Sequence, residues 1–245
     1  MKIIIWICWE EVEKVKNLIS LEIRKVLLKP HMFGMAAANI IIFLLSAFTS
    51  SLLTQNGNMP AFNGLPPAQL DTVSLALMLV RATLIVWEAV FLCVFIIEEY
   101  RNRTISLLYT YPVNRTKLML AKLLLVCGIM LLFHTVSYIF QYACILLASK
   151  YFVFVTFSLG DIWVQAVTAI SAIMLGLFPL YVGMIKKSTI ATVVSSIVIV
   201  VIASNSQGCH AGLLSMPVAA TILGIIGIAF SAMALHRMVA SDLNN

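Results

Sequence analysis

Charged residues are scarce in this chain. Asp, Glu, Lys and Arg make up 11% of its 245 residues, while 62% of the residues are hydrophobic. A soluble globular domain carries about 25% charged residues and about 45–50% apolar ones. One soluble core cannot bury this much apolar surface, so the surrounding solvent must be lipid. The net charge of +6 does not indicate a nucleic-acid partner, because the basic residues cluster at the ends of apolar segments.

Several motifs that would place the chain in another class are also missing. The five cysteines are scattered, none forms a C-x-x-C pair, and we interpret them as small packing residues without a disulfide framework. No second His or carboxylate lies at ligand spacing from His134, so no metal site is expected there. No repeat, linker or long external loop divides the sequence, which indicates one membrane domain over residues 1–245.

Six apolar segments are long enough, or nearly so, to cross a bilayer as helices, which takes about 20 residues each. The Val/Ile run of the fifth segment, Val193 to Ile202, is short but too apolar for a surface loop. The expected fold is therefore an all-α integral membrane protein with six transmembrane helices. The predicted spans are residues 31–54, 73–97, 118–147, 161–184, 188–204 and 217–236.

Basic residues fall on one side of these spans. With six crossings, 14 of the 16 Lys and Arg residues share that side, and the exceptions are Lys150 in an opposite loop and Arg81 within a span. Cytoplasmic loops carry such an excess of basic residues, so we expect both termini in the cytoplasm. The expected location is the cell membrane of a prokaryote.

The segment before the first span predicts an amphipathic helix. Within residues 1–30, the apolar residues of 10–29 recur at helical spacing, and Pro30 ends or bends the helix. It is too charged to span, so we expect it to lie along the cytoplasmic membrane surface. Two roles stay open, a simple anchor or a helix that passes movement from a partner to the first span.

One long polar stretch interrupts the apolar sequence, between the second and third spans, from Glu98 to Arg115. Thr104 can cap a short helix that starts at Ile105, and Tyr111-Pro112 would stop it. Asn114 can cap the next helix. The result is a short cytoplasmic helix that presents Leu107 and Leu108, which an ordinary loop would not need to expose.

This stretch resembles a known family. It matches the region after the second span of ABC-2 type transporter permeases, where the usual pattern is E-x-R-x-G-T, two leucines, P-x-[ST]-R and a downstream lysine. The chain departs from that pattern at Arg103, where Gly is usual, and at Asn114, where Ser is common. The length of the chain, the surface helix before the first span and the number of spans also fit this family, so the resemblance covers the whole chain. The matching residues are Glu99, Arg101, Thr104, Leu107, Leu108, Pro112, Arg115 and Lys122.

The resemblance implies a transport subunit and not an enzyme. Such permeases pair with a cytoplasmic ATP-binding subunit, and the short helix resembles the coupling helix that docks into it. Glu99, Arg101, Thr104, Leu107, Leu108, Pro112 and Arg115 would then couple the chain to that ATPase. The chain has no G-x-x-x-x-G-K-[ST], so ATP and Mg²⁺ are expected in the partner and no cofactor in this chain. A second permease chain, identical or related, would complete the pathway.

The cargo is not encoded in a recognisable motif. A compact permease that is rich in Met and aliphatic residues suits an amphipathic or hydrophobic peptide, or a drug-like toxin. Our first hypothesis is export of antimicrobial peptides or self-immunity to them. Other drugs, as in multidrug resistance, lipid-linked glycans and ions stay open, as does the direction of transport.

Three ionisable residues lie inside predicted spans. Arg81 and Glu88 are two turns apart on one face of the second span, about 10 Å along its axis, and His134 lies in the third. An ionised group at mid-membrane costs about 2.5–3.5 kcal/mol on insertion scales, and such groups are often functional. They either line a substrate route or make structural contacts, which for Arg81 includes reaching the head groups. Whether Arg81 and Glu88 pair is left open.

Other polar and small residues indicate helix packing. Ser137, Tyr138 and Gln141 follow His134 at helical spacing and predict polar contacts with a neighbouring helix. Ala172-x-x-x-Gly176 and Ala220-x-x-x-Gly224 predict a close helix approach, either within the chain or between two permeases.

Two other functions compete with this interpretation. A secondary transporter or channel would need intramembrane ion ligands or broken spans in both halves, and Glu88 has no counterpart in spans four to six. An intramembrane CAAX-type protease is suggested by Glu98-Glu99-x-x-x-Arg103, but the four histidines do not fit its patterns.

Overall fold

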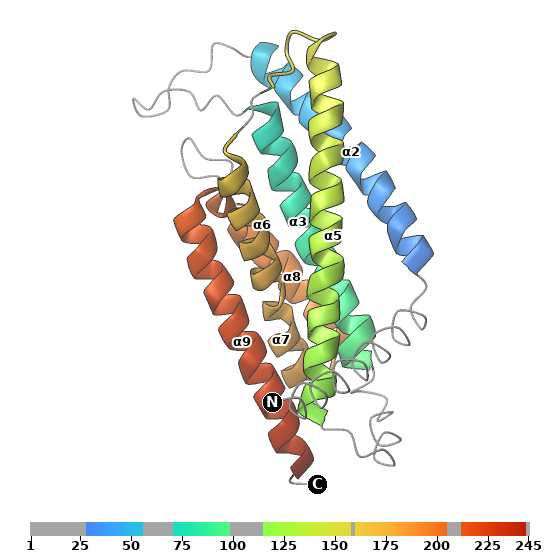
Figure 1. The fold of residues 1–245 in the computed structure, drawn as a ribbon, viewed down its shortest axis with the longest axis vertical. Helices are drawn as coiled ribbons and strands as arrows, with labels where there is room; N and C mark the ends of the chain where they lie inside the picture. Colours follow the sequence, from blue (N-terminus) through green and yellow to red (C-terminus); the bar gives the residue numbers. More distant parts are fainter. Residues whose placement is uncertain (1–27, 56–70, 99–114, 158–159, 205–211, 244–245) are drawn as a thin grey trace, which may run out of the picture.

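The structure is a computed structural model that describes residues 28–55, 71–98, 115–157, 160–204 and 212–243 (Figure 1). Every regular element within these ranges is a helix, which confirms the all-α class. The elements are α2 (Leu28–Gln55), α3 (Thr72–Leu92), the π-helix η2 (Cys93–Ile97), α5 (Arg115–Ser149), α6 (Ile162–Gly176), α7 (Phe178–Lys186), α8 (Thr189–Ala203), the 3₁₀ turn η4 (Leu213–Ser215) and α9 (Pro217–Leu243).

The predicted spans coincide with these helices. Five segments of the described chain are long and apolar enough to cross a membrane: Lys29–Leu52, Thr72–Ile97, Met119–Ser149, Ile162–Lys186 and Pro217–Arg237. The predicted fifth span is α8, whose 15 residues rise about 22 Å, short of a hydrocarbon core of about 30 Å. The chain is thus a multi-pass, all-helical membrane protein in which α8 is shorter than a full crossing.

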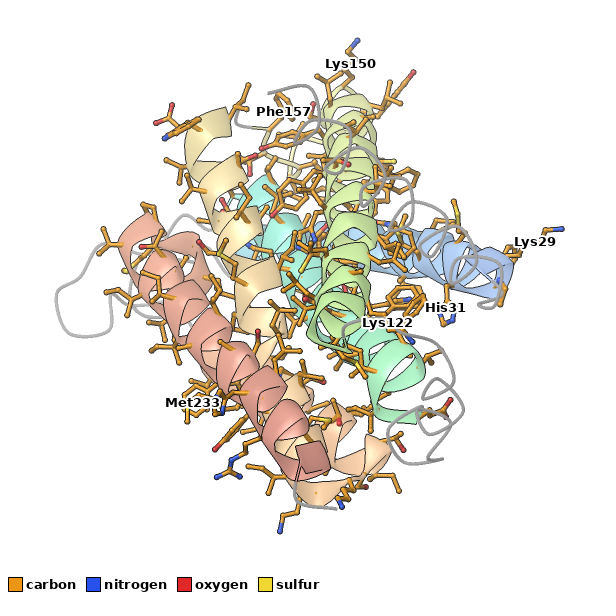
Figure 2. The ribbon with its side chains drawn as sticks, turned by 60° about the horizontal axis from the view of Figure 1, so that its bottom comes forward. Lys29, His31, Lys122, Lys150, Phe157 and Met233 are labelled. Carbon is orange, nitrogen blue, oxygen red and sulfur yellow. The ribbon has the colours of Figure 1, made fainter. Side chains whose placement is uncertain are left out.

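The helices run alternately in opposite directions along the long axis of the bundle, with α6 and α7 together forming one pass (Figure 1). Lys29, Lys122, Lys186 and Arg237 consequently lie toward one end. Lys150 follows the opposite end of α5, where its side chain projects away from the helices (Figure 2). This separation is the charge asymmetry that the sequence predicts for the described basic residues.

Helix α3 is the centre of the bundle. It packs against α2, α5, α6 and α8. In the most apolar part of the Thr72–Ile97 span, 67% of the residues are buried, compared with 22% for the α2 span and 28% for the α9 span. The outer helices keep large apolar side chains exposed, such as Phe33 at 80% and Ile225 at 65%. Such exposure is ordinary for a surface that faces lipid and would be unfavourable in water.

The predicted span 161–184 corresponds to the described segment Ile162–Lys186, which is interrupted within its length. It divides at Leu177, between α6 and α7. Pro179 lies in the first turn of α7 and has no N–H to continue the ladder of hydrogen bonds from α6. The Leu177 N–H instead bonds to the Met174 carbonyl at 3.4 Å, and the Leu180 N–H to the Leu177 carbonyl at 3.1 Å. A proline one turn after Gly176 therefore accounts for the break.

A tight turn joins α7 to α8. Lys187 adopts the left-handed conformation, with φ 48°, which is a common way for a helix to end. Ser188 then caps α8, where its side chain accepts a hydrogen bond from the Ala191 N–H at 3.5 Å. Helices α7 and α8 pack against each other as a hairpin at the basic end of the bundle.

Small residues bring α6 and α9 together. Ala172 and Ala220 are fully buried, and a Cβ atom on Gly224 would lie 3.3 Å from the Ser171 Cα atom. Gly227, which the sequence pattern did not include, lies still closer to the backbone at Met174. Within the chain, these small residues therefore serve internal helix packing. Gly176 is an exception, since it faces α3.

Candidate functional site

A polar seam runs through the apolar interior, between α3, α5 and α6. We use this name for five residues: Arg81 and Glu88 of α3, His134 and Tyr138 of α5, and Thr168 of α6. Arg81 is 5% exposed, His134 2%, Thr168 1% and Glu88 0%. The central position of α3 explains the seam, because the face of α3 that carries Arg81 and Glu88 packs against both neighbouring helices.

Arg81 lies in the interior of the bundle, where its side chain is 5% exposed. Its Nη1 donates hydrogen bonds to Thr168 Oγ1 at 2.9 Å and to the Leu214 carbonyl at 3.2 Å. These bonds connect α3 to α6 and to η4. Its Nε has no partner. Both acceptors are neutral, so neither compensates the guanidinium charge.

His134 and Tyr138 face the same region from α5. His134 Nδ1 lies 3.0 Å from the Met130 carbonyl, and since a carbonyl only accepts, Nδ1 carries the proton and Nε2 of a neutral ring is an acceptor. Nε2 and the Tyr138 hydroxyl have no hydrogen-bond partner. The two rings meet edge to face at 6.0 Å, and the Arg81 charge acts on both side chains.

Glu88 occupies a separate position, two turns further along α3. Neither carboxyl oxygen has a hydrogen-bond partner, so Arg81 and Glu88 do not pair. The carboxyl group packs directly against Gly176, which is the last residue of α6. A Cβ atom at residue 176 would overlap the carboxyl group. Cys127 of α5 lies within electrostatic range of it. Glu88 thus lies beside the break between α6 and α7.

The other polar face of α5 is structural. Asn39 of α2 donates to Ser137 Oγ at 3.0 Å, and Gln141 Nε2 donates to the Asn39 carbonyl at 2.9 Å. This confirms the prediction of polar helix packing for Ser137 and Gln141, while Tyr138 turns toward Arg81 instead. Asn39 was missed by the sequence analysis, although a lone Asn in an apolar span is a recognisable signal for such a contact.

The predicted coupling residues lie mostly outside the described residues. This applies to Glu99, Arg101, Thr104, Leu107, Leu108 and Pro112, and to the amphipathic helix predicted over residues 10–29. Arg115 begins α5, directly after the predicted cap Asn114. Lys122, the downstream lysine of the motif, has a side chain that is 2% exposed. These roles therefore remain predictions.

No metal centre is evident in the parts of the chain that the structure describes. Within them, no three His, Cys, Asp or Glu side chains gather closely enough to hold an ion. Three free cysteines belong to helices, Cys93 to η2 and Cys127 and Cys144 to α5. The site therefore offers hydrogen bonding and charge, and it has no arrangement of nucleophile and base.

Comparison with known proteins decides the family. A family model described as ABC-2 family transporter protein matches residues 18–204. The chain belongs to the ABC-2 transporter family. The match includes α2 to α8, the polar seam and the stretch that carries the coupling motif. It supports a membrane transport subunit over an enzyme.

A relative from Bacillus subtilis (strain 168), named Uncharacterized protein YcbO, is 32% identical over 234 residues. The alignment covers 92% of this ABC-2 family chain and 99% of the relative, so the similarity extends over nearly the full length of both proteins. No solved structure was found to match the chain.

Proposed function

We propose that this chain is the permease subunit of an ATP-driven exporter. It forms the translocation pathway with a second permease chain, identical or related, and separate cytoplasmic ATPase subunits supply the energy. The observation that carries the proposal is the family match, which spans both the membrane helices and the polar stretch between α3 and α5. Residues 1–245 act as one membrane domain with six crossings and cytoplasmic termini.

Coupling to the ATPase takes place at the polar stretch between Glu98 and Arg115. The helix predicted from Thr104 to Tyr111 docks into the ATPase through Leu107 and Leu108. In the sequence this stretch lies between two helices of the polar seam, because η2 extends α3 up to Ile97 and α5 begins at Arg115. A displacement of the docked helix is therefore transmitted to α3, the most buried span.

The break between α6 and α7 supports movement in this part of the bundle. Breaks at proline and π-helical turns are sites where helices bend. The chain has both near Glu88, at Pro179 and in η2. The Cys93 thiol also donates to the Thr189 carbonyl at 3.5 Å, which joins η2 to the start of α8.

The cargo is an amphipathic or hydrophobic peptide or toxin, and its export or self-immunity to it is the cellular role that we favour. Arg81, Glu88 and His134 lie along the pathway. No cofactor binds this chain, and ATP and Mg²⁺ bind in the ATPase partner.

A co-purification experiment tests the proposal. The chain is isolated from native membranes in mild detergent, and the proteins that accompany it are identified by mass spectrometry. An ATP-binding subunit is expected with the wild type and should be lost with Leu108→Asp or Thr104→Pro. Ser106→Asp is the matched control, because it introduces the same charge on the opposite side of the predicted helix and should retain the partner. If cross-linked wild-type protein brings no ATPase, the proposal is wrong.

A further inference from the structure

The guanidinium of Arg81 is a positive charge inside the bundle, and no carboxylate within the described ranges pairs with it. Arg stays protonated in proteins, and its side chain is 5% exposed. Both of its hydrogen bonds go to neutral oxygens, those of Thr168 and the Leu214 backbone. Among the described residues no carboxylate accepts a hydrogen bond from it.

Few acidic residues in the sequence could supply a counter-charge to Arg81. From residue 40 to residue 97 and from residue 116 to residue 240, the acidic residues are Asp71, Glu88 and Asp161. Asp71 precedes α3 by one residue and Asp161 precedes α6, so Asp71 lies about 15 Å from Arg81 along the helix. The oxygens of Glu88 have no partner. None of the described carboxylates therefore compensates Arg81, which leaves the position of its counter-charge to an anion from a bound molecule.

Unpartnered polar atoms lie around the same charge. Arg81 Nε and the Tyr138 hydroxyl are hydrogen-bond donors without an acceptor. Both are buried, and buried polar groups in proteins nearly always have a partner. A carboxylate accepts several hydrogen bonds at once and binds Arg with favourable geometry. The chemical group that would accept hydrogen bonds from both of these donors and balance the Arg81 charge is therefore an oxyanion.

We propose that Arg81 and Tyr138 bind the carboxylate group of an amphipathic cargo, with Arg81 as the charge partner and Tyr138 as a second donor. This deepens the proposed function, on which it rests, by naming the chemical group of the cargo that the permease recognises. The apolar body of the cargo then lies along the helices of the bundle.

The depth of Arg81 favours cargo over a membrane lipid. It is the tenth residue of α3, about 14 Å inside the helix end, and α5, α6 and η4 enclose it. A lipid phosphate would have to leave the head-group plane and pass between helices to reach it. A transported molecule makes that passage in any case.

The boundary between α5 and α6 is the route to Arg81. The Tyr142 hydroxyl donates to Gln165 Oε1 across it, and both residues are only partly buried. Tyr142 is one turn from Tyr138 on α5, and Gln165 is one turn from Thr168 on α6. Separation of the Tyr142–Gln165 contact would open a polar path from the outer end of the bundle to the guanidinium.

The test compares two forms of one probe. The full chain is purified, without ATPase or ATP, into phosphatidylcholine nanodiscs. The probe is a fluorescent amphipathic helical peptide, prepared with either a free C-terminal carboxylate or a carboxamide. Binding is measured by anisotropy after subtraction of empty nanodiscs. The wild type should prefer the carboxylate on the order of tenfold, the contribution expected of a charge-assisted hydrogen bond.

Arg81→Gln should abolish this preference, and Arg81→Lys should retain part of it. Tyr138→Phe should reduce it by a few fold, which keeps the proposal testable if Arg81→Gln fails to fold. Thr83→Ala is the matched control on the same helix, because Thr83 bonds only to the backbone of α3, and it should keep the full preference. A purely structural Arg81 would change stability and leave the ratio of the two affinities unchanged.

Two results would overturn the proposal. One is the absence of a carboxylate preference in the wild type, or its persistence in Arg81→Gln. The other is a response to phosphatidylglycerol in the nanodisc, lost in Arg81→Gln, without any response to the peptide carboxylate, which would make the anion a lipid. Since no ATPase is present, either result is independent of the co-purification test of the proposed function.

Discussion

The carboxyl group of Glu88 occupies the space that a side chain at Gly176 would need. This contact joins the central helix α3 to the last residue of α6, just before the helix breaks. It explains why residue 176 carries no side chain, and it fixes the position of a buried carboxyl group that has no hydrogen-bond partner.

Gly176→Ala should therefore destabilise the protein. The added methyl group meets the Glu88 carboxyl and forces α3 and α6 apart, at a cost of about 1–3 kcal/mol for overpacking. The measurement is the Tm of the purified protein in detergent. Gly128→Ala is the matched control, because no atom lies within 4 Å of a Cβ at that position of α5, and it should be neutral or slightly stabilising.

The same contact predicts coupling between the two residues. Glu88→Ala removes the obstacle, so Gly176→Ala should cost much less in a Glu88→Ala background than in the wild type. A double-mutant cycle on Tm measures this interaction. Additive effects would show that the two side chains do not share space.

Asn39→Leu should weaken the packing of α2 on α5. The substitution removes the side-chain bonds from Asn39 Nδ2 to Ser137 Oγ and from Gln141 Nε2 to Asn39 Oδ1, while the Gln141 bond to the backbone carbonyl of residue 39 remains. Polar contacts between membrane helices contribute about 1 kcal/mol, so a modest fall in Tm is expected. Thr135→Ala is the control, since Thr135 is exposed and bonds only within α5. An equal effect of both substitutions would contradict the structure.

The orientation of the bundle can be tested by cysteine labelling. Lys150→Cys should react with a membrane-impermeant maleimide in intact cells, and Lys186→Cys should react only after the cells are opened. The reason is that α6 and α7 together carry the chain from one end of the bundle to the other. The native thiols described by the structure lie inside the helices, and the unsubstituted protein gives the background. Labelling in the opposite sense would place the basic residues outside.

Much of the fold follows from hydropathy and charge alone. Apolar length predicts the described helices within a few residues, and the basic residues predict which helix ends share a side. The break at Leu177 was missed because the apolar pattern continues across it, even though Pro179 is a visible cause. The short length of α8 was predicted, because residues 188–204 form the shortest of the six predicted spans and α8 has 15 residues.

The site was predictable only in part. Burial of Arg81, Glu88 and His134 follows from their rarity in apolar helices. Their partners do not, because Thr168, Gly176 and the Leu214 carbonyl are 80 or more residues away. Neither Thr168 nor Leu214 has a charge or motif that marks it, and the small-residue motif of Gly176 predicts a close helix approach without identifying Glu88 as the neighbour. Tertiary packing alone decides that Arg81 meets neutral oxygens and Glu88 meets a glycine.

The most direct test of the central claim is the energy source of transport. Inside-out membrane vesicles that contain the chain and its co-purified ATPase are given the fluorescent carboxylate peptide, with or without ATP and with or without a proton uncoupler. The account predicts accumulation that requires ATP, withstands the uncoupler and is lost with Leu108→Asp. Accumulation that continues without ATP and stops with the uncoupler would show a secondary transporter instead.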